Sequence, residues 1–174
     1  MRSFLLLAKK TDLSSHRGLL TRFIAGALLL SHGTRKDVWA AILFDGEVLV
    51  SFEGWGMRNV RPDEQSLSGI LRAGLRKGEE RGKARVLQGV TAKRAGIEEL
   101  APKLPGKKYF FEGRGSTHGI RGEIAVVFGC RGIEGEFAER LRGLSFEPLR
   151  LGAREVPVDQ AAVIVNNAID RLQP

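Results

Sequence analysis

The stretch "LRLGAREVPVDQAAVIVNNAID", residues 149–170, carries the strongest indication of the fold. It begins as a short apolar strand, passes through a loop that contains Gly152, and continues as a helix rich in Ala, Val and Ile. A strand that leads through a tight loop into a helix is the repeating unit of α/β proteins. The stretch therefore predicts the last strand of an α/β domain and a last helix from about Val158 to Leu172.

Upstream of this stretch, apolar strands and helices continue to alternate, and three strands are each followed by a glycine-containing loop. The loops are "GRGSTHG" (113–119), "GCRGIEG" (129–135) and "GAREVPV" (152–158). In an open α/β sheet, ligands bind beyond the carboxyl ends of the strands, and glycine lets the backbone approach a ligand closely. The three loops together predict a nucleoside pocket, although each alone could be an ordinary turn. The P-loop pattern is absent, and loop 113–119 leads into a strand, which does not fit a Rossmann fingerprint.

The first half of the chain supplies further elements of the same sheet. Residues 3–8 form an apolar run typical of a buried strand, and the periodicity that follows predicts a helix ending near His32. Asp45-Gly46 between two apolar runs predicts an antiparallel hairpin. Residues 61–81 predict a helix, and residues 83–108 a short strand and a short helix. The predicted fold is α/β, with a mostly parallel sheet flanked by helices.

The composition indicates a polyanionic partner. The chain has 28 Lys and Arg against 20 Asp and Glu, a formal net charge of +8, and a calculated pI of about 10.1. Such a surface attracts tRNA, rRNA or DNA because neutralised phosphates release counterions, although a thermophile's charge-rich surface is an alternative. Cys130 is the single cysteine, which favours a reducing, cytoplasmic location. The longest apolar run, residues 23–30, is too short to span a membrane.

The residues of the final loop and helix carry a resemblance to a known family. "LRLGAREVPVDQAA" (149–162) resembles the corresponding segment of the SPOUT class of S-adenosylmethionine-dependent RNA methyltransferases. "MRSFLLLAKK" (1–10), "LLSHGTRKDV" (29–38) and "RPDEQSLSGILRAGLRKG" (61–78) resemble one branch of it, the archaeal tRNA (pseudouridine-54-N1)-methyltransferase family. The resemblance implies a C-terminal trefoil knot and a homodimer. It also implies a single domain, 1–174, with a substrate-side part (1–84) and a knotted cofactor-binding part (85–174).

The resemblance assigns S-adenosylmethionine to the three loops. In the family, an apolar residue lies beside the adenine, and backbone groups of the last loop contact the base. Because backbone contacts do not depend on side-chain identity, the assignment tolerates substitutions such as Ala161, where closer relatives carry Cys. The implied cofactor-binding residues are Phe111, Gly129, Leu149, Arg150, Leu151, Gly152, Ala153, Arg154 and Ala161.

The same resemblance implies methyl transfer to N1 of a pseudouridine in tRNA. Once the N1 proton has left, that nitrogen can attack the sulfonium methyl directly, so the enzyme mainly positions the reactants and stabilises an anionic ring. No metal is implied. The candidate catalytic residues are Arg22, Arg35, Asp37, Asp63 and Glu64, with His32 as a further participant. Each has an alternative role: Asp63 and Glu64 could favour a helix N-terminus, His32 could interact with helix-end carbonyls, and Arg35 and Asp37 could form a surface pair.

The sequence also departs from the pattern of this branch. Gly18 stands where an acidic residue is expected, and Gln65 and Ser66 replace an Arg-Asn pair after Pro-Asp-Glu. These departures leave open the target nucleotide, the proton acceptor, and which arginines contact phosphate. Two alternatives to tRNA pseudouridine methylation therefore remain at this point: a knotted methyltransferase acting on rRNA pseudouridine or another nucleoside, and a non-catalytic knotted RNA-binding protein.

Overall fold

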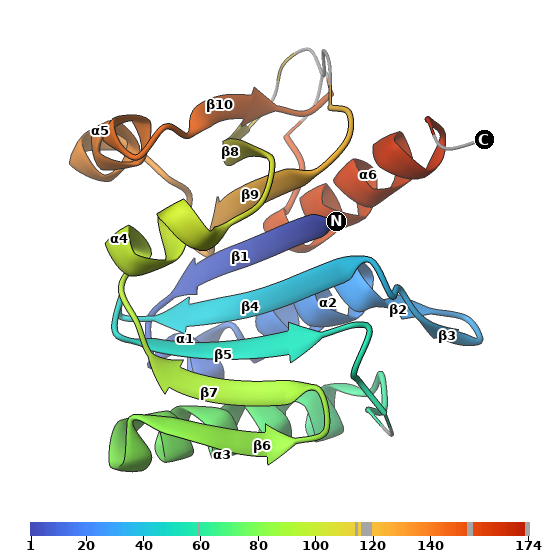
Figure 1. Ribbon diagram of the computed structural model, residues 1–174, viewed down its shortest axis with the longest axis vertical. Helices are drawn as coiled ribbons and strands as arrows, with labels where there is room; N and C mark the ends of the chain where they lie inside the picture. Colours follow the sequence, from blue (N-terminus) through green and yellow to red (C-terminus); the bar gives the residue numbers. More distant parts are fainter. Residues whose placement is uncertain (59, 114, 116–119, 153–154, 173–174) are drawn as a thin grey trace.

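A computed structural model describes residues 1–58, 60–113, 115, 120–152 and 155–172. Within these residues, eight strands form one sheet in the order β10-β8-β9-β1-β4-β5-β7-β6 (Figure 1). The strands of this sheet are β1 (Arg2–Ala8), β4 (Val38–Phe44), β5 (Val48–Glu53), β6 (Lys83–Leu87), β7 (Val90–Arg94), β8 (Lys107–Gly113), β9 (Ile124–Gly129) and β10 (Glu147–Arg150). The helices are α1 (Asp12–Ser15), α2 (Arg17–Leu28), α3 (Glu64–Arg81), α4 (Ile97–Leu100), the 3-10 helix η1 (Ala101–Lys103), α5 (Gly135–Gly143) and α6 (Val158–Asp170).

The sheet is mixed, and its parallel part determines where a ligand can bind. Strand β1 pairs in parallel with β4 and β9, and β8 pairs in parallel with β9 and β10. The carboxyl ends of these five strands therefore meet at one edge of the sheet, as expected from the sequence. Strands β5, β7 and β6 extend the sheet by antiparallel pairing. An α/β fold with a large sheet flanked by helices is confirmed.

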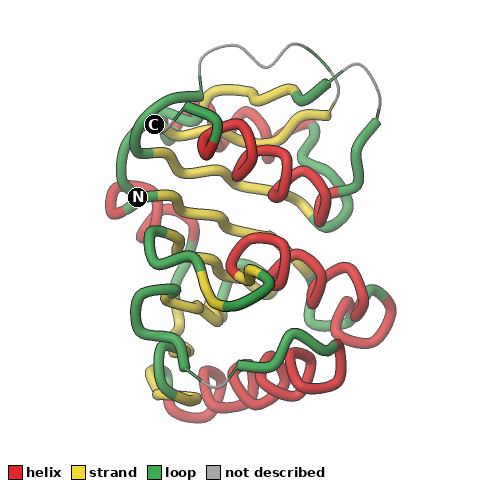
Figure 2. Tube along the Cα trace, turned by 90° about the vertical axis from the view of Figure 1, so that its right-hand side faces the viewer, coloured by secondary structure: helices red, strands yellow, loops and turns green. Residues whose placement is uncertain are grey.

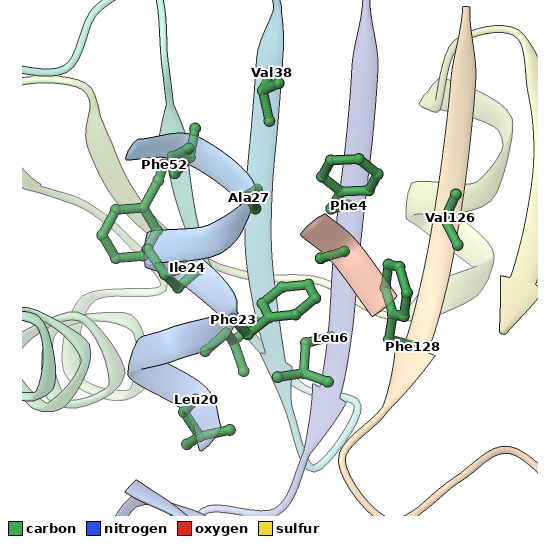
Figure 3. Close-up of a cluster of buried hydrophobic side chains, with 14 of the residues drawn as sticks. Phe4, Leu6, Leu20, Phe23, Ile24, Ala27, Val38, Phe52, Val126 and Phe128 are labelled. Carbon is green, nitrogen blue, oxygen red and sulfur yellow. The ribbon is translucent and has the colours of Figure 1, made fainter. Parts of the chain in front are cut away.

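Helices cover both faces of the sheet, because both faces carry apolar side chains. Figure 2 shows helices on both sides of the sheet. Residues alternate between the faces along β1: Phe4 and Leu6 pack with α2, α3 and α6, whereas Leu5 packs with α4 and α5. Figure 3 shows Phe23 of α2 and Phe128 of β9 meeting over β1, with ring centroids 5.4 Å apart. The described part of the chain contains no helix long and apolar enough to cross a membrane.

Two local predictions were wrong, and one was confirmed. The helix predicted to end near His32 ends at Leu28, because Leu29 is extended and a small hairpin, β2 (Leu29–Leu30) with β3 (Gly33–Thr34), follows. The region predicted as one short strand contains two, β6 and β7, paired with each other. The hairpin at Asp45-Gly46 is present, and both residues have the positive φ that such a turn requires.

The last helix is fixed to the start of the chain by a buried polar cluster. The Arg2 side chain is 3% exposed and contacts Asp170 at 2.7 Å and Asp37 at 3.0 Å. It also donates to Asn166 Oδ1 at 3.0 Å, and Asn166 Nδ2 donates to the Ala27 carbonyl at 3.0 Å. Because buried charges are costly unless paired, this cluster orients α6 against β1 and α2. The C-terminal half of α6 is thereby anchored to the start of the chain.

Candidate functional site

A cavity of about 460 Å³ lies at the carboxyl ends of β8 and β9, between the starts of α5 and α6. Its lining combines apolar side chains, such as Phe111, Ile133 and Val158, with three glycines and four charged residues. The glycines are Gly113, Gly132 and Gly135, and the charged residues are Glu112, Glu134, Glu139 and Arg142. Its volume lies in the range of small-molecule sites, about 300–1,000 Å³. The cavity therefore has the size and the mixed lining of a site for a nucleoside-sized ligand.

Two of the three predicted loops are joined by main-chain hydrogen bonds beside this cavity. The Leu151 N–H donates to the Gly113 carbonyl at 2.8 Å, and the Gly115 N–H donates to the Gly152 carbonyl at 2.7 Å. Gly113 and Gly152 have φ values of 112° and 65°, which side-chain-bearing residues rarely adopt. The loops after β8 and β10 are thus joined into one backbone unit.

A second cavity of about 450 Å³ borders the first and shares Gly132, Ile133 and Glu134 with it. Gly129 lines this second cavity. A Cβ on Gly129 would lie 2.1 Å from the Gly132 carbonyl oxygen, so only glycine allows the loop to fold back here. The loop after β9 therefore forms the wall between the two cavities.

A polar cluster at the edge of the second cavity contains the described residues best suited to hold a metal. Ligand atoms of Asp12, His16 and Cys130 lie within 4.8 Å of one another. Burial raises the pKa of the Cys130 thiol to about 11, assisted by the Asp12 carboxylate. Despite its burial, Asp12 has a lowered pKa because Arg131 and the Lys9 N–H donate to it. These hydrogen bonds link α1 to the loop that follows β9.

The structure places the predicted cofactor residues at different depths. Phe111 lines the first cavity, and Leu149 lies next to it in the β8–β10 register. Arg150 projects outward and pairs with Glu112 at 2.7 Å. Leu151 and Gly152 belong to the joined loops described above, whereas Ala161 lies on the buried face of α6. Ala153 and Arg154 lie outside the described residues.

Two of the predicted substrate-side residues form ion pairs between helices: Arg22, in the middle of α2, and Glu64, the first residue of α3. Arg22 Nε contacts Asp159 Oδ2 at 2.7 Å, and Asp159 follows Val158, which lines the first cavity. Glu64 pairs at 2.6 Å with Arg17, the first residue of α2. The Asp159 side chain is 8% exposed and was not predicted as a site residue. Its only sequence signal is an acid in the first turn of a helix.

The remaining candidates have structural partners. Asp63 caps α3, accepting from the Ser66 N–H at 2.8 Å, and this bond lowers the pKa of the Asp63 carboxyl. Arg35 pairs with Asp170 at 2.8 Å at the end of α6, whereas Asp37 pairs with Arg2. Arg35 and Asp37 therefore form ion pairs with Asp170 and Arg2, and not with each other as the alternative role suggested. His32 lies exposed in the turn between β2 and β3.

The chain is similar to known proteins in sequence and in fold. A family described as "Putative SAM-dependent RNA methyltransferase" matches residues 1–174. Two relatives are named tRNA (pseudouridine(54)-N(1))-methyltransferase. That of Methanosarcina acetivorans is 24% identical over 165 residues, covering 89% of this chain and 78% of the relative. That of Haloferax volcanii is 27% identical over 161 residues, covering 87% and 81%.

A solved structure shows a similar fold. It is the crystal structure of Archaeoglobus fulgidus Nep1 bound to S-adenosylhomocysteine, with a TM-score of 0.67 and 14% sequence identity. The match covers 99% of this chain and 98% of that chain. At this low identity, the likeness concerns the fold alone.

Proposed function

The chain belongs to the S-adenosylmethionine-dependent RNA methyltransferase family, and we propose that it methylates N1 of a pseudouridine in tRNA. Position 54 is the proposed target, because the relatives from Methanosarcina acetivorans and Haloferax volcanii are named for it. The observation that carries the proposal is the first cavity, which opens where two hydrogen-bonded glycine loops and the start of α6 meet.

The lining of this cavity fits the cofactor. Phe111, Ile133 and Val158 provide apolar surface for an adenine ring, and the joined loops provide main-chain donors and acceptors nearby. Helix α5 begins at Gly135 on the cavity wall, and the partial positive charge of a helix start favours a carboxylate. When bound, S-adenosylmethionine supplies an electrophilic methyl group on a sulfonium.

On the substrate side, Arg22 is the residue best placed to stabilise negative charge. Its guanidinium is 64% exposed, whereas the Asp159 carboxylate that orients it is 8% exposed. A uracil ring that loses its N1 proton becomes anionic, and a fixed cation near it lowers the barrier to methyl transfer. Asp159 thus acts as a positioning residue for Arg22 at the start of α6.

The proposal includes the C-terminal knot and the division of the chain. The bonds from Leu151 to Gly113 and from Gly115 to Gly152 support a crossing of the loops after β8 and β10, followed by α6. In this proposal, residues 85–174 hold the cofactor and residues 1–84 face the tRNA in the cytoplasm. Val163 and Ile164, which are 47% and 38% exposed on α6, support a homodimer through this helix.

Analysis of modified nucleosides tests the proposal. A tRNA transcript carrying pseudouridine at position 54 is incubated with the protein and deuteromethyl-labelled S-adenosylmethionine, then digested and analysed by mass spectrometry. We expect labelled N1-methylpseudouridine, and none from a transcript with uridine at that position. Label appearing only in rRNA, or in no RNA at all, would contradict the assignment.

A further inference from the structure

Trp55 is the only exposed aromatic residue in the part of the chain that the structure describes. Its side chain is 48% exposed, on the turn that follows β5. An indole that stays in water does not contribute the stability that its burial would give, and exposed aromatic surface often marks a binding site. This residue lies outside the cavities at the carboxyl edge of the sheet.

The turn that carries Trp55 is packed tightly on both sides. A Cβ on Gly54 would lie 1.9 Å from the Arg35 carbonyl oxygen, and a Cβ on Gly89 would lie 2.4 Å from the Met57 nitrogen. The Gly56 N–H also donates to the Glu53 carbonyl at 2.9 Å. The backbone is therefore held in place while the indole remains on the surface, which is the arrangement of a preformed stacking surface.

A small groove lies beside this turn. It has a volume of about 250 Å³ and is lined by the β2–β3 hairpin and by residues of the segment after Trp55. Leu30, Met57, Val60 and Pro62 give it apolar walls, and Leu30 is 51% exposed. A groove of this size and character suits a flat ring the size of a nucleobase.

The charges around the groove are mainly positive. Arg58 lines it and is exposed, and Lys36 Nζ donates to the Gly54 carbonyl at 3.2 Å, directly before Trp55. Of the nearby carboxylates, Asp37 is paired with Arg2, and Glu53 is half-buried. A cationic rim around an exposed aromatic ring is complementary to a nucleic-acid strand, in which phosphates flank each base.

We propose that Trp55 and the adjoining groove bind one unpaired base of the RNA substrate, with Lys36 and Arg58 contacting the neighbouring phosphates. The proposal rests on the proposed function, because it takes the RNA of that reaction as the ligand. Stacking on an aromatic ring tolerates any base, so this site adds affinity without selecting the methylated nucleotide. It provides a contact with RNA at the amino edge of the sheet, away from the cofactor cavity.

Binding of a labelled tRNA transcript to the full chain and its variants tests this site. Trp55→Ala is expected to weaken binding about tenfold, and Trp55→Phe, which can still stack, by less than about threefold. Lys36→Gln is expected to lower the salt slope of binding by about one, whereas Trp55→Ala leaves the slope unchanged. Lys103→Gln, which removes an exposed cation on η1, is the matched control and should behave like the parent.

Two further measurements keep the outcome interpretable. RNA should quench the tryptophan emission of the parent but not that of Trp55→Phe, which retains only the half-buried Trp39. The affinity for S-adenosylmethionine, measured by calorimetry, should be unchanged in Trp55→Ala. Parental RNA affinity in Trp55→Ala, or a lower oligomeric mass in light scattering instead of weaker RNA binding, would overturn the proposal. If the parent transfers no methyl group, the proposed function is contradicted. The dependence of RNA binding on Trp55 can still be measured in that case.

Discussion

Gly18 leaves space that charged side chains of α2 and α3 occupy. A Cβ on residue 18 would lie 2.8 Å from Arg22 Nη1 and 3.3 Å from Glu64 Oε2. A larger residue would therefore require the end of the Arg22 side chain to shift. Gly18 is thus linked to the placement of Arg22, which contacts Asp159.

Substitution of Arg22 tests its role as the cation near the substrate. Arg22→Gln should lower kcat about 100-fold, because a positioned charge that stabilises an anionic transition state is lost. Stability should also fall, by about 1–3 kcal/mol, because the Asp159 carboxylate, 8% exposed, loses its ion-pair partner. Single-turnover methyl transfer at saturating tRNA measures the effect, with Arg81→Gln on the last turn of α3 as the control. A parental rate in Arg22→Gln would remove this residue from the site.

At the scale of elements, helix α3 has a side-chain cap at its N-terminus, one buried apolar face and one exposed basic face. Asp63 caps its first turn, and Leu67 and Leu71 are buried, whereas Arg72 and Arg76 are exposed. The sequence predicted this helix and both faces because its apolar periodicity is strong. The sequence left two roles open for Asp63, a helix start and a catalytic motif, and the structure shows that Asp63 caps the helix.

Charge reversal on α3 tests whether its basic face contacts the RNA backbone. The double variant Arg72→Glu, Arg76→Glu should reduce the salt slope of tRNA binding by about two, because each lost phosphate contact releases one counterion fewer. Anisotropy titrations between low and moderate salt give the slope. The pair Lys103→Glu, Lys107→Glu, which carries the same charge change, is the control. An unchanged slope in the α3 variant would place the RNA on another surface.

At the scale of the whole molecule, β1 and α6 connect distant parts of the chain. Strand β1 pairs with β9, more than 100 residues away, and Arg2 contacts Asp170. Local periodicity predicted the strands and helices but not these neighbours, because long-range pairing leaves no signal in a single segment. The same reason explains why Asp159 was missed, since its role depends on Arg22. The glycine loops were predictable because glycine spacing is local.

The exposed apolar residues of α6 lead to a prediction about assembly. Ile164→Asp should convert a dimer to a monomer, because a carboxylate buried in an apolar interface is costly. Light scattering at tens of micromolar protein measures the mass. Lys103→Asp introduces the same side chain at η1 and should leave the dimer intact. A monomeric parent, or a dimeric Ile164→Asp variant, would contradict an interface through α6.

Calorimetric titration with S-adenosylmethionine tests the central claim most directly, because the function depends on cofactor binding in the first cavity. Glu139 and Glu136 are both exposed on α5, but only Glu139 lines that cavity. Glu139→Trp would place a bulky ring over the cavity, and Glu136→Trp places the same ring elsewhere on the helix. The account predicts one cofactor per chain in the parent and in Glu136→Trp, and binding at least tenfold weaker in Glu139→Trp. No binding heat in the parent, or equal affinity in all three proteins, would contradict it.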